Sequence, residues 1–171
     1  RINDSAKHLL NLINGLLDLS KIEAGKMEVH LETFDVPTLV REAVATLKPL
    51  FARKANQLVV ECPETLGAMR ADLVKVRQCL LNLLSNAVKF TMEGMVALRV
   101  GARPGAGHMF QLTAEIEDTG PGITSQELER LFHPFEQAQA GKTGGAGTGL
   151  GLAISRGYAR LMGGNITVKS R

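Results

Sequence analysis

The sequence predicts an α+β fold: a two-layer α/β sandwich with a mixed, mainly antiparallel sheet, preceded by a long N-terminal helix. Three observations predict it. Helical and strand-like patterns are mixed along the chain, which favours a two-layer sandwich over a doubly wound sheet. Two strand-like runs, 95–100 and 109–117, alternate like paired strands. The 171 residues are 44% hydrophobic and 22% charged, as in chains that pack a core.

The first 22 residues predict a helix whose apolar positions recur at alternating steps of four and three. These positions are Ile2, Ala6, Leu9, Ile13 and Leu16. Further leucines widen the apolar face, so two interpretations stay open: a helix packed on its own domain, or one helix of a bundle or dimer. A helix stop at 23–26 places a module boundary near residue 25, which separates residues 1–25 from a main domain over 26–171.

The main domain is expected to begin with a short strand over 27–33. Asp35 can then cap a helix that carries Pro37 in its first turn, whereas Pro49 should kink or shorten that helix. The remaining elements are weak strands at 58–61 and 68–70, a long helix from the Asp72 cap to about Thr91, the paired strands joined by 101–107, a short helix at 124–132, a Gly-rich loop at 136–148, a helix at 149–162 and a last strand at 166–169.

Composition and charge exclude several classes of protein. No apolar run approaches the roughly 18 residues that cross a bilayer, and no basic-then-apolar leader opens the chain. Cys62 and Cys79 are too few for a disulfide framework or a four-ligand zinc site, so we expect reduced thiols in a cytoplasmic setting. The net charge of +3 is scattered, with no Trp and one Tyr, so no nucleic-acid partner is indicated.

The long helix after Asp72 carries an unusual polar face. At about 100° per residue, Asn82, Asn86 and Lys89 gather opposite its broad apolar side. A solvated face is the plain alternative, but Asn is a poor helix former, and two of them one turn apart suggest a task. A carboxamide oxygen suits Mg²⁺ and a lysine suits phosphate oxygens.

A second candidate site follows the apolar strand 109–116. Asp118 begins an Asp-Thr-Gly-Pro-Gly-Ile run in which glycines flank a proline. Backbone of this kind can approach a flat ligand, and the carboxylate can accept hydrogen bonds from an amino group such as that of adenine. A tight turn that closes the strand is the alternative. An aspartic protease would need a second such triplet, and the chain has one.

A Gly-rich run, 141–151, leads directly into a helical segment. Free backbone N–H groups at a helix start form a phosphate cradle, whereas a surface linker is the alternative. The Walker and dinucleotide-binding patterns both fail here, because the required glycine spacing or the preceding strand is missing. Phe132 and Phe135 are expected to pack beside these glycines, and His133 and His8 are taken as structural because neither has partners at metal-ligand spacing.

Together these segments resemble the ATP-binding catalytic domain of sensor histidine kinases, in the superfamily shared with gyrase, MutL and the chaperone ATPases, which has a Bergerat-type fold. Residues 82–91 look like its N box, 118–123 like its G1 box, 132–135 like its F box and 147–152 like its G2 box. Residues 8–26 are similar to the second helix of the dimerisation and phosphotransfer hairpin, with its link to the kinase core.

The resemblance implies ATP and Mg²⁺ as ligands. Asn86 would coordinate Mg²⁺ with Asn82 beside it, Lys89 would touch phosphate, Asp118 would select adenine, and the G2 glycines would hinge a lid over about 136–148. The implied nucleotide-binding residues are Asn82, Asn86, Lys89, Phe90, Asp118, Gly120, Gly122, Ile123, Phe135, Gly147, Thr148, Gly149, Leu150 and Gly151.

The resemblance also implies phosphate transfer from ATP to a histidine and then to a response-regulator aspartate, with homodimerisation through the N-terminal helix. The family's acceptor histidine lies on the first hairpin helix, which the chain lacks, so no catalytic residue is assigned. The strand that completes the family's sheet is expected to be missing, and Ala146 replaces a common glycine. Rival functions are a hydrolytic or Ser/Thr-phosphorylating relative, or a degenerate signalling module. Membrane anchoring of the parent protein stays open.

Overall fold

The computed structural model describes residues 2–105, 110–136 and 148–170, which divide into two compact units. One unit comprises Leu31–Gly122, and the other comprises Arg1–His30 with Ile123–Arg171. We describe each unit by itself. The predicted division at residue 25 follows a helix end, since the first helix, α1, spans Ile2–Glu23 and Gly25 has a positive φ of 64°.

The unit over Leu31–Gly122 contains two sheets and two long helices. Strand β1 (Glu32–Asp35) pairs antiparallel with β3 (Ala68–Ala71). The second sheet has the order β2–β4–β5, in which β2 (Gln57–Glu61) runs parallel to β4 (Met95–Pro104) and β4 runs antiparallel to β5 (Phe110–Asp118). A mixed, mainly antiparallel arrangement is therefore confirmed.

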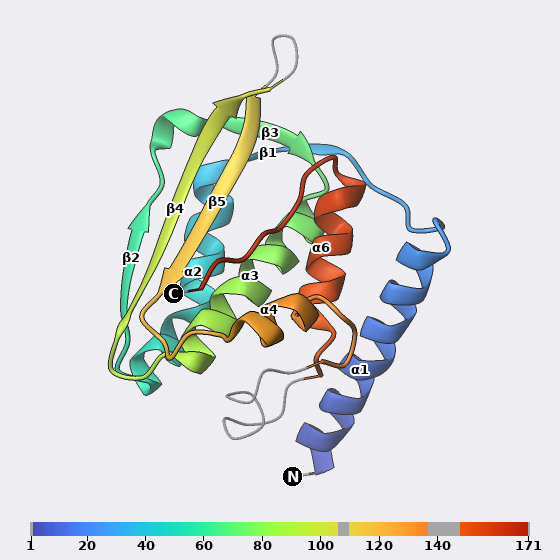
Figure 1. The fold of residues 1–171 in the computed structure, drawn as a ribbon. Helices are drawn as coiled ribbons and strands as arrows, with labels where there is room; N and C mark the ends of the chain where they lie inside the picture. Colours follow the sequence, from blue (N-terminus) through green and yellow to red (C-terminus); the bar gives the residue numbers. More distant parts are fainter. Residues whose placement is uncertain (1, 106–109, 137–147, 171) are drawn as a thin grey trace. The chain divides into compact units, whose positions relative to one another are not determined.

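Helices α2 (Val36–Arg53) and α3 (Leu73–Phe90) lie on one face of the β2–β4–β5 sheet, which makes two layers (Figure 1). Apolar side chains of β4 alternate toward the helices, as the period of a strand requires. The buried core consists of Val36, Leu39, Val40, Ala43, Phe51, Leu80, Leu84, Ala87, Val88, Val96, Leu98 and Val100. A short 3₁₀ turn, η1 (Glu64–Leu66), connects β2 to β3.

Both helices begin at the predicted aspartate caps. Asp35 accepts a hydrogen bond from the Thr38 backbone at 2.9 Å and from the Thr38 hydroxyl at 2.6 Å. Asp72 accepts from the Lys75 backbone at 3.0 Å and also forms a buried ion pair with the Lys75 ammonium at 2.6 Å. These caps satisfy N–H groups that lack intrahelical partners. Their surroundings differ, because Asp35 is exposed and Asp72 is buried.

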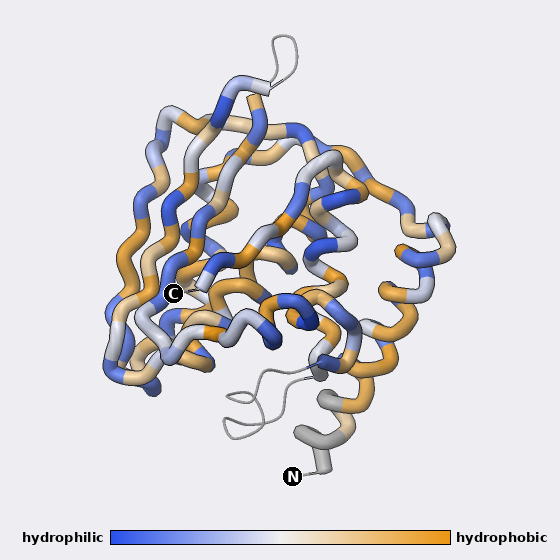
Figure 2. The backbone as a smooth tube through the Cα atoms, in the orientation of Figure 1, coloured by the Kyte–Doolittle hydropathy of each residue, from blue (hydrophilic) through white to orange (hydrophobic). Residues whose placement is uncertain are grey.

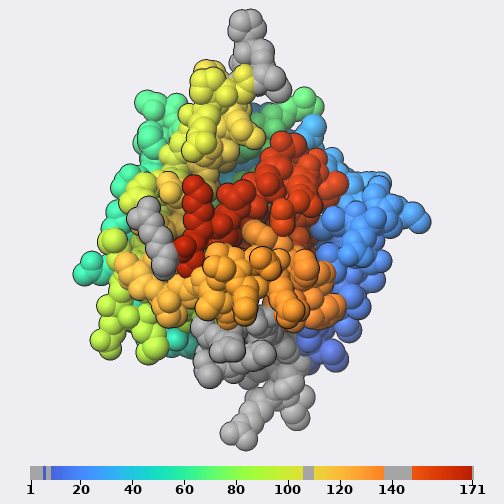
Figure 3. All heavy atoms as spheres, in the orientation of Figure 1, coloured from blue at the N-terminus to red at the C-terminus, as the bar shows by residue number. Residues whose placement is uncertain are grey.

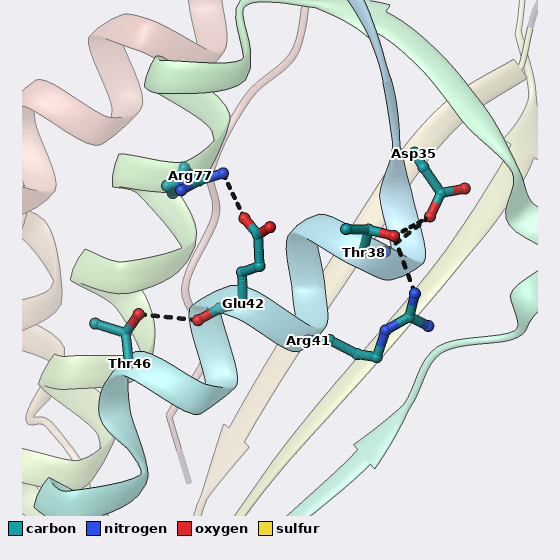
Figure 4. A network of polar contacts seen from close by, with 6 residues as sticks. All are labelled: Asp35, Thr38, Arg41, Glu42, Thr46 and Arg77. Atoms are coloured by element: carbon teal, nitrogen blue, oxygen red, sulfur yellow. Dashed lines mark hydrogen bonds and ion pairs between the residues drawn. The ribbon is translucent and has the colours of Figure 1, made fainter.

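A polar network extends from the Asp35 cap along α2 (Figure 4). Arg41 donates to the Thr38 hydroxyl at 2.9 Å. The next residue, Glu42, pairs with Arg77 of α3 at 2.6 Å, so this pair connects the two helices. These are exposed or half-exposed contacts, and each is expected to contribute little stability compared with the apolar core between the helices.

The other unit packs α1 against α6 (Gly151–Leu161) and also contains the short helix α4 (Ser125–Arg130). Two glycines allow the close approach of α1 and α6. A Cβ at Gly157 would lie 2.9 Å from the Ile22 side chain, and one at Gly15 would lie 3.3 Å from Ile154. Tyr158, buried on α6, donates to Asp18 at 2.8 Å. The α1 helix is therefore packed on its own unit along one side.

Other side chains of α1 stay exposed. Figure 2 shows α1 as largely hydrophobic along the part that is coloured. The exposed apolar residues are Leu9, Leu10, Ile13, Leu16 and Leu17, each between 48% and 58% accessible. The bundle or dimer interpretation of this helix stays a prediction. No helix within the described residues is both long and apolar enough to cross a membrane.

Two predicted strands differ from the structure, and one helix needs comment. Residues 27–31 form no strand, because β1 begins at Glu32 and its partner β3 has only four residues to pair with. Helix α2 continues through the buried Phe51 to Arg53, with Pro49 inside it, so Pro49 does not shorten the helix, and a kink at Pro49 stays a prediction. Residues 166–169 form no strand, since they do not pair with any strand in the described part of the chain.

Candidate functional site

The polar face of α3 is half-buried at Asn82, Asn86 and Lys89. The two asparagines lie one helical turn apart, a spacing that brings their Cβ atoms within about 6 Å. The Lys89 ammonium lies 5.1 Å from the centre of the Phe90 ring, which shields one side of that cation while its other side can meet an anion. This face is less exposed than an ordinary solvated helix face.

The metal-binding capacity of this face is limited to carboxamide oxygens. Among the described residues, no group of three or more His, Cys, Asp or Glu side chains could hold a metal ion. Carboxamide oxygen is a hard donor that fits Mg²⁺, an ion that usually keeps several waters and takes further ligands from substrate phosphates. The donor set fits a metal that arrives with a nucleotide rather than one held by the protein alone.

Asp118 is the last residue of β5, and a tight turn follows it. Its Oδ1 atom accepts a hydrogen bond from the Gly120 backbone at 2.9 Å and a long one from the Thr91 hydroxyl at 3.4 Å. Within the described part of the chain, its second oxygen, Oδ2, has no hydrogen-bond partner. The turn therefore fixes one oxygen of an exposed carboxylate and leaves the other available to a ligand.

Glycine is needed at two positions of this turn for different structural reasons. A Cβ at Gly120 would lie 2.7 Å from Asp118 Oδ1 and 3.1 Å from the Phe90 carbonyl oxygen, so no side chain fits there. Gly122 has a φ of 75°, which favours glycine for conformational reasons. Phe90, Asp118 and Gly120 thus lie close together, although Phe90 comes from a different segment of the sequence.

Sequence reasoning missed two polar residues: Thr91, which contacts Asp118, and Asn56, which contacts Thr91. Thr91 follows α3, is buried with 1% of its surface accessible, and directs its hydroxyl at Asp118. Asn56 donates to the Thr91 carbonyl at 2.8 Å and accepts from the Gly94 backbone at 3.0 Å. The available signal was weak: an Asn between a helix and a strand often hydrogen-bonds nearby backbone, but its partners here lie 35 and 38 residues away.

In the other unit, the predicted aromatic and glycine motifs lie against each other. The Phe135 backbone N–H donates to the Gly149 carbonyl at 3.1 Å, and a Cβ at Gly149 would lie 2.7 Å from the Phe135 backbone. Both residues have positive φ, 66° and 69°. Phe132 takes a different role, because the Arg156 guanidinium stacks over its ring at 4.4 Å.

The start of α6 carries the remaining predicted residues. Thr148 accepts a hydrogen bond from the Leu150 backbone at 3.2 Å, Leu150 is buried, and Gly151 begins the helix. In the described part of the chain, no side chain caps this helix start, so its first N–H groups are suited to an anion. Gly147, Ala146 and most of the predicted lid fall outside the described residues.

Ile123 opens the segment that leads to α4. Its backbone N–H donates to the Ser170 hydroxyl at 2.8 Å, and Figure 3 shows the segment from Ile123 to Glu136 beside the C-terminal segment. Thr124 caps α4 through a reciprocal capping box with Glu127. These contacts hold Ile123 at a defined position in its unit.

Comparison with known proteins identifies the family. The model of the histidine kinase-, DNA gyrase B-, and HSP90-like ATPases matches residues 71–171. The circadian input-output histidine kinase CikA of Synechococcus elongatus is 41% identical over 173 residues, which cover 99% of this chain and 22% of the relative. The sensor protein GacS of Pseudomonas syringae pv. syringae is 39% identical over 171 residues, which cover 99% and 19%.

A solved structure supports the same assignment. The crystal structure of full-length ShkA in complex with AMPPNP matches with a TM-score of 0.77 and 30% identity, over 98% of this chain and 35% of that one. The chain spans about a fifth of the length of the two curated relatives. The chain therefore belongs to the histidine kinase-, DNA gyrase B- and HSP90-like ATPase family, as an ATP-binding catalytic domain of the kind found in two-component sensor histidine kinases.

Proposed function

We propose that this chain binds ATP with Asp118 as the acceptor for the adenine amino group. The observation that carries the proposal is the divided role of this carboxylate: Oδ1 is engaged by Gly120 and Thr91, and Oδ2 has no partner among the described residues. An amino group is a donor, and a carboxylate is a pure acceptor, so the pair is complementary. Guanine presents a carbonyl oxygen at the same ring position and would be disfavoured.

The polar face of α3 is proposed to serve the phosphates. Asn86 would supply an oxygen ligand to Mg²⁺, with Asn82 beside it, and Lys89 would bind phosphate oxygens. The metal, when bound, neutralises charge on the phosphates. The other proposed nucleotide contacts are Phe90, Gly120, Gly122, Ile123, Phe135, Gly147, Thr148, Gly149, Leu150 and Gly151, through backbone N–H groups and close backbone approach.

In the whole protein, we propose that the γ-phosphoryl group passes from ATP to a histidine. The bond from γ-phosphorus to the bridging oxygen breaks, ADP leaves, and a phosphorus–nitrogen bond forms with the imidazole. Catalysis is assigned to positioning and charge neutralisation. Asn82 cannot act as a general base, so transfer to water should be slow. A response-regulator aspartate is the proposed next acceptor, and α1 is the proposed dimerisation element.

Calorimetric titration of residues 1–171 with nucleotides tests the proposal. ATP and ADP should bind with micromolar dissociation constants, about 7–8 kcal/mol, and ATP should bind more tightly when Mg²⁺ is present. Equal affinity for GTP would contradict the adenine assignment, and no binding of any nucleotide would contradict the function as a whole. In a longer protein that contains the acceptor, acid-labile, base-stable label would support histidine over Ser, Thr or water as acceptor.

A further inference from the structure

The turn between α3 and β4 is held by one side chain from a distant part of the sequence. Asn56 precedes β2, and its Nδ2 donates to the Thr91 carbonyl at 2.8 Å and to the Val88 carbonyl at 3.4 Å. Its Oδ1 accepts from the Gly94 backbone at 3.0 Å. One carboxamide therefore engages carbonyls at the end of the helix and fixes the far side of the turn.

The same turn is in contact with the residues around Asp118. A Cβ at Gly94 would lie 2.4 Å from the Thr119 hydroxyl and 2.7 Å from the Thr91 methyl, so the backbone of the turn lies directly against both. Thr119 in turn accepts from the Met95 backbone at 3.0 Å. A shift of the turn would move the Thr91 hydroxyl relative to Asp118, because the two threonines enclose Gly94.

Asp118 depends on these neighbours for its direction. It pairs with Val96 in the β4–β5 register, and the next residue, Thr119, donates its backbone N–H to the Met95 carbonyl at 3.1 Å. These contacts hold the backbone of Asp118, whereas its carboxylate is held by other partners. Its Oδ1 is positioned by the Gly120 backbone and the Thr91 hydroxyl, both on short turns. The orientation of Oδ2, the oxygen available to a ligand, follows from where Oδ1 is held.

We propose that Asn56 is a positioning residue for purine recognition: it holds the turn of Thr91–Gly94, and through Thr91 it sets the direction of Asp118 Oδ2. This inference rests on the proposed function, in which Asp118 accepts from the adenine amino group. Asn56 itself touches no nucleotide. Its removal should lower discrimination for the amino group, rather than lowering nucleotide binding uniformly.

The test compares ATP with purine riboside triphosphate, which has hydrogen in place of the adenine amino group. Wild-type chain should prefer ATP by about 10- to 100-fold, the effect of a hydrogen bond to a charged group. In Asn56→Ala this preference should fall to within about threefold, mostly through weaker ATP binding. Thr91→Val, which keeps the shape but removes the hydroxyl, should reduce the preference in the same direction, and Thr91→Ser should restore most of it.

Gln57→Ala is the matched control, since it removes a carboxamide from the adjacent, exposed position and should leave the preference unchanged. If Asn56→Ala does not fold, Asn56→Asp decides, because it keeps the acceptor for Gly94 and loses the donor to Thr91. An unchanged preference in the folded Asn56 variant, or equal weakening of both nucleotides, would overturn the positioning role. Failure of the wild-type chain to bind either nucleotide would instead refute the proposed function.

Discussion

The two ends of α3 use buried polar groups for opposite purposes. At its start, Asp72 and Lys75 neutralise each other at 2.6 Å, and Asp72 also caps the helix. At its end, Thr91 is equally buried, but its hydroxyl leads outward to Asp118, a carboxylate with one oxygen unpartnered among the described residues. A polar group matched inside the protein contributes to stability, whereas an unmatched one at the surface remains available to a ligand.

Of the substitutions predicted here, one at the N-terminal end of α3 should have the largest effect on stability. Asp72→Ala removes the cap and leaves the Lys75 charge in a buried place, so the free energy of unfolding should fall by about 3 kcal/mol. Urea unfolding followed by circular dichroism measures this change. The folded variant should bind ATP as the wild type does, because the altered end of α3 carries no proposed nucleotide contact.

Two variants separate the cap from the ion pair. Asp72→Asn keeps an acceptor for the Lys75 backbone and loses the negative charge, whereas Lys75→Met removes the buried cation. Lys75→Met should destabilise less than Asp72→Ala, since the helix cap remains and the backbone N–H of residue 75 still donates to the Asp72 carboxylate. A loss below about 1 kcal/mol in Asp72→Ala would contradict the contrast between the two ends of the helix.

At the C-terminal end, the effect should appear in binding. Asp118→Asn replaces the carboxylate by a weaker acceptor, so ATP affinity should fall by about 10- to 100-fold. Asp118 is exposed, so unfolding free energy should change by only about 0.5 kcal/mol. Calorimetry and urea unfolding of one sample measure both quantities. Large destabilisation with unchanged ATP affinity would reverse the roles assigned to the two ends.

The polar face of α3 offers an intermediate case at Asn86, four residues before the helix ends. Asn86→Ala should lower ATP affinity about tenfold when Mg²⁺ is present and change it little when EDTA is present, because only the metal contact is removed. Gln78→Ala, an exposed carboxamide on the same helix, is the control. An unchanged dependence on Mg²⁺ in Asn86→Ala would remove Asn86 from metal binding.

The exposed cap of α2 should give the smallest effect, and one that depends on pH. Hydrogen bonds from the Thr38 hydroxyl and then the Thr38 backbone hold the pKa of Asp35 below its ordinary value. Because the folded pKa is lowered, the unfolded chain binds more protons in acid, and stability from this group is present above about pH 4 and is lost as pH falls through the folded pKa. The free energies of unfolding of the wild type and of Asp35→Ala should therefore converge as the pH falls. A difference that widens on acidification would contradict this sign.

Local chemistry made most of the fold predictable. Asp35 and Asp72 each cap the helix that the sequence assigned to them, because capping depends on residues three apart. The strand expected at 27–33 was wrong because strand formation depends on a partner, and β3 offers only four residues. Pro49 does not shorten α2, because the helix continues to Arg53 and places Phe51 in the core.

The candidate site was predictable only where one motif holds the chemistry. Asp118 and Gly120 lie two residues apart, so their hydrogen bond follows from a local turn. Asn56 could not be found in this way, since its contacts with Thr91 and Gly94 form only when the chain has folded. The roles assigned to Asn86, Lys89 and the glycines stay predictions.

The glycine at position 157 affects how α1 packs against α6. The only atom of its side chain is a hydrogen, and the Ile22 side chain occupies the space where any larger group would sit. A methyl group introduced there would overlap the Ile22 side chain, which would have to shift on α1 to make room. Gly157→Ala thus offers a way to alter the packing between two helices, without any change to the residues proposed to bind a nucleotide.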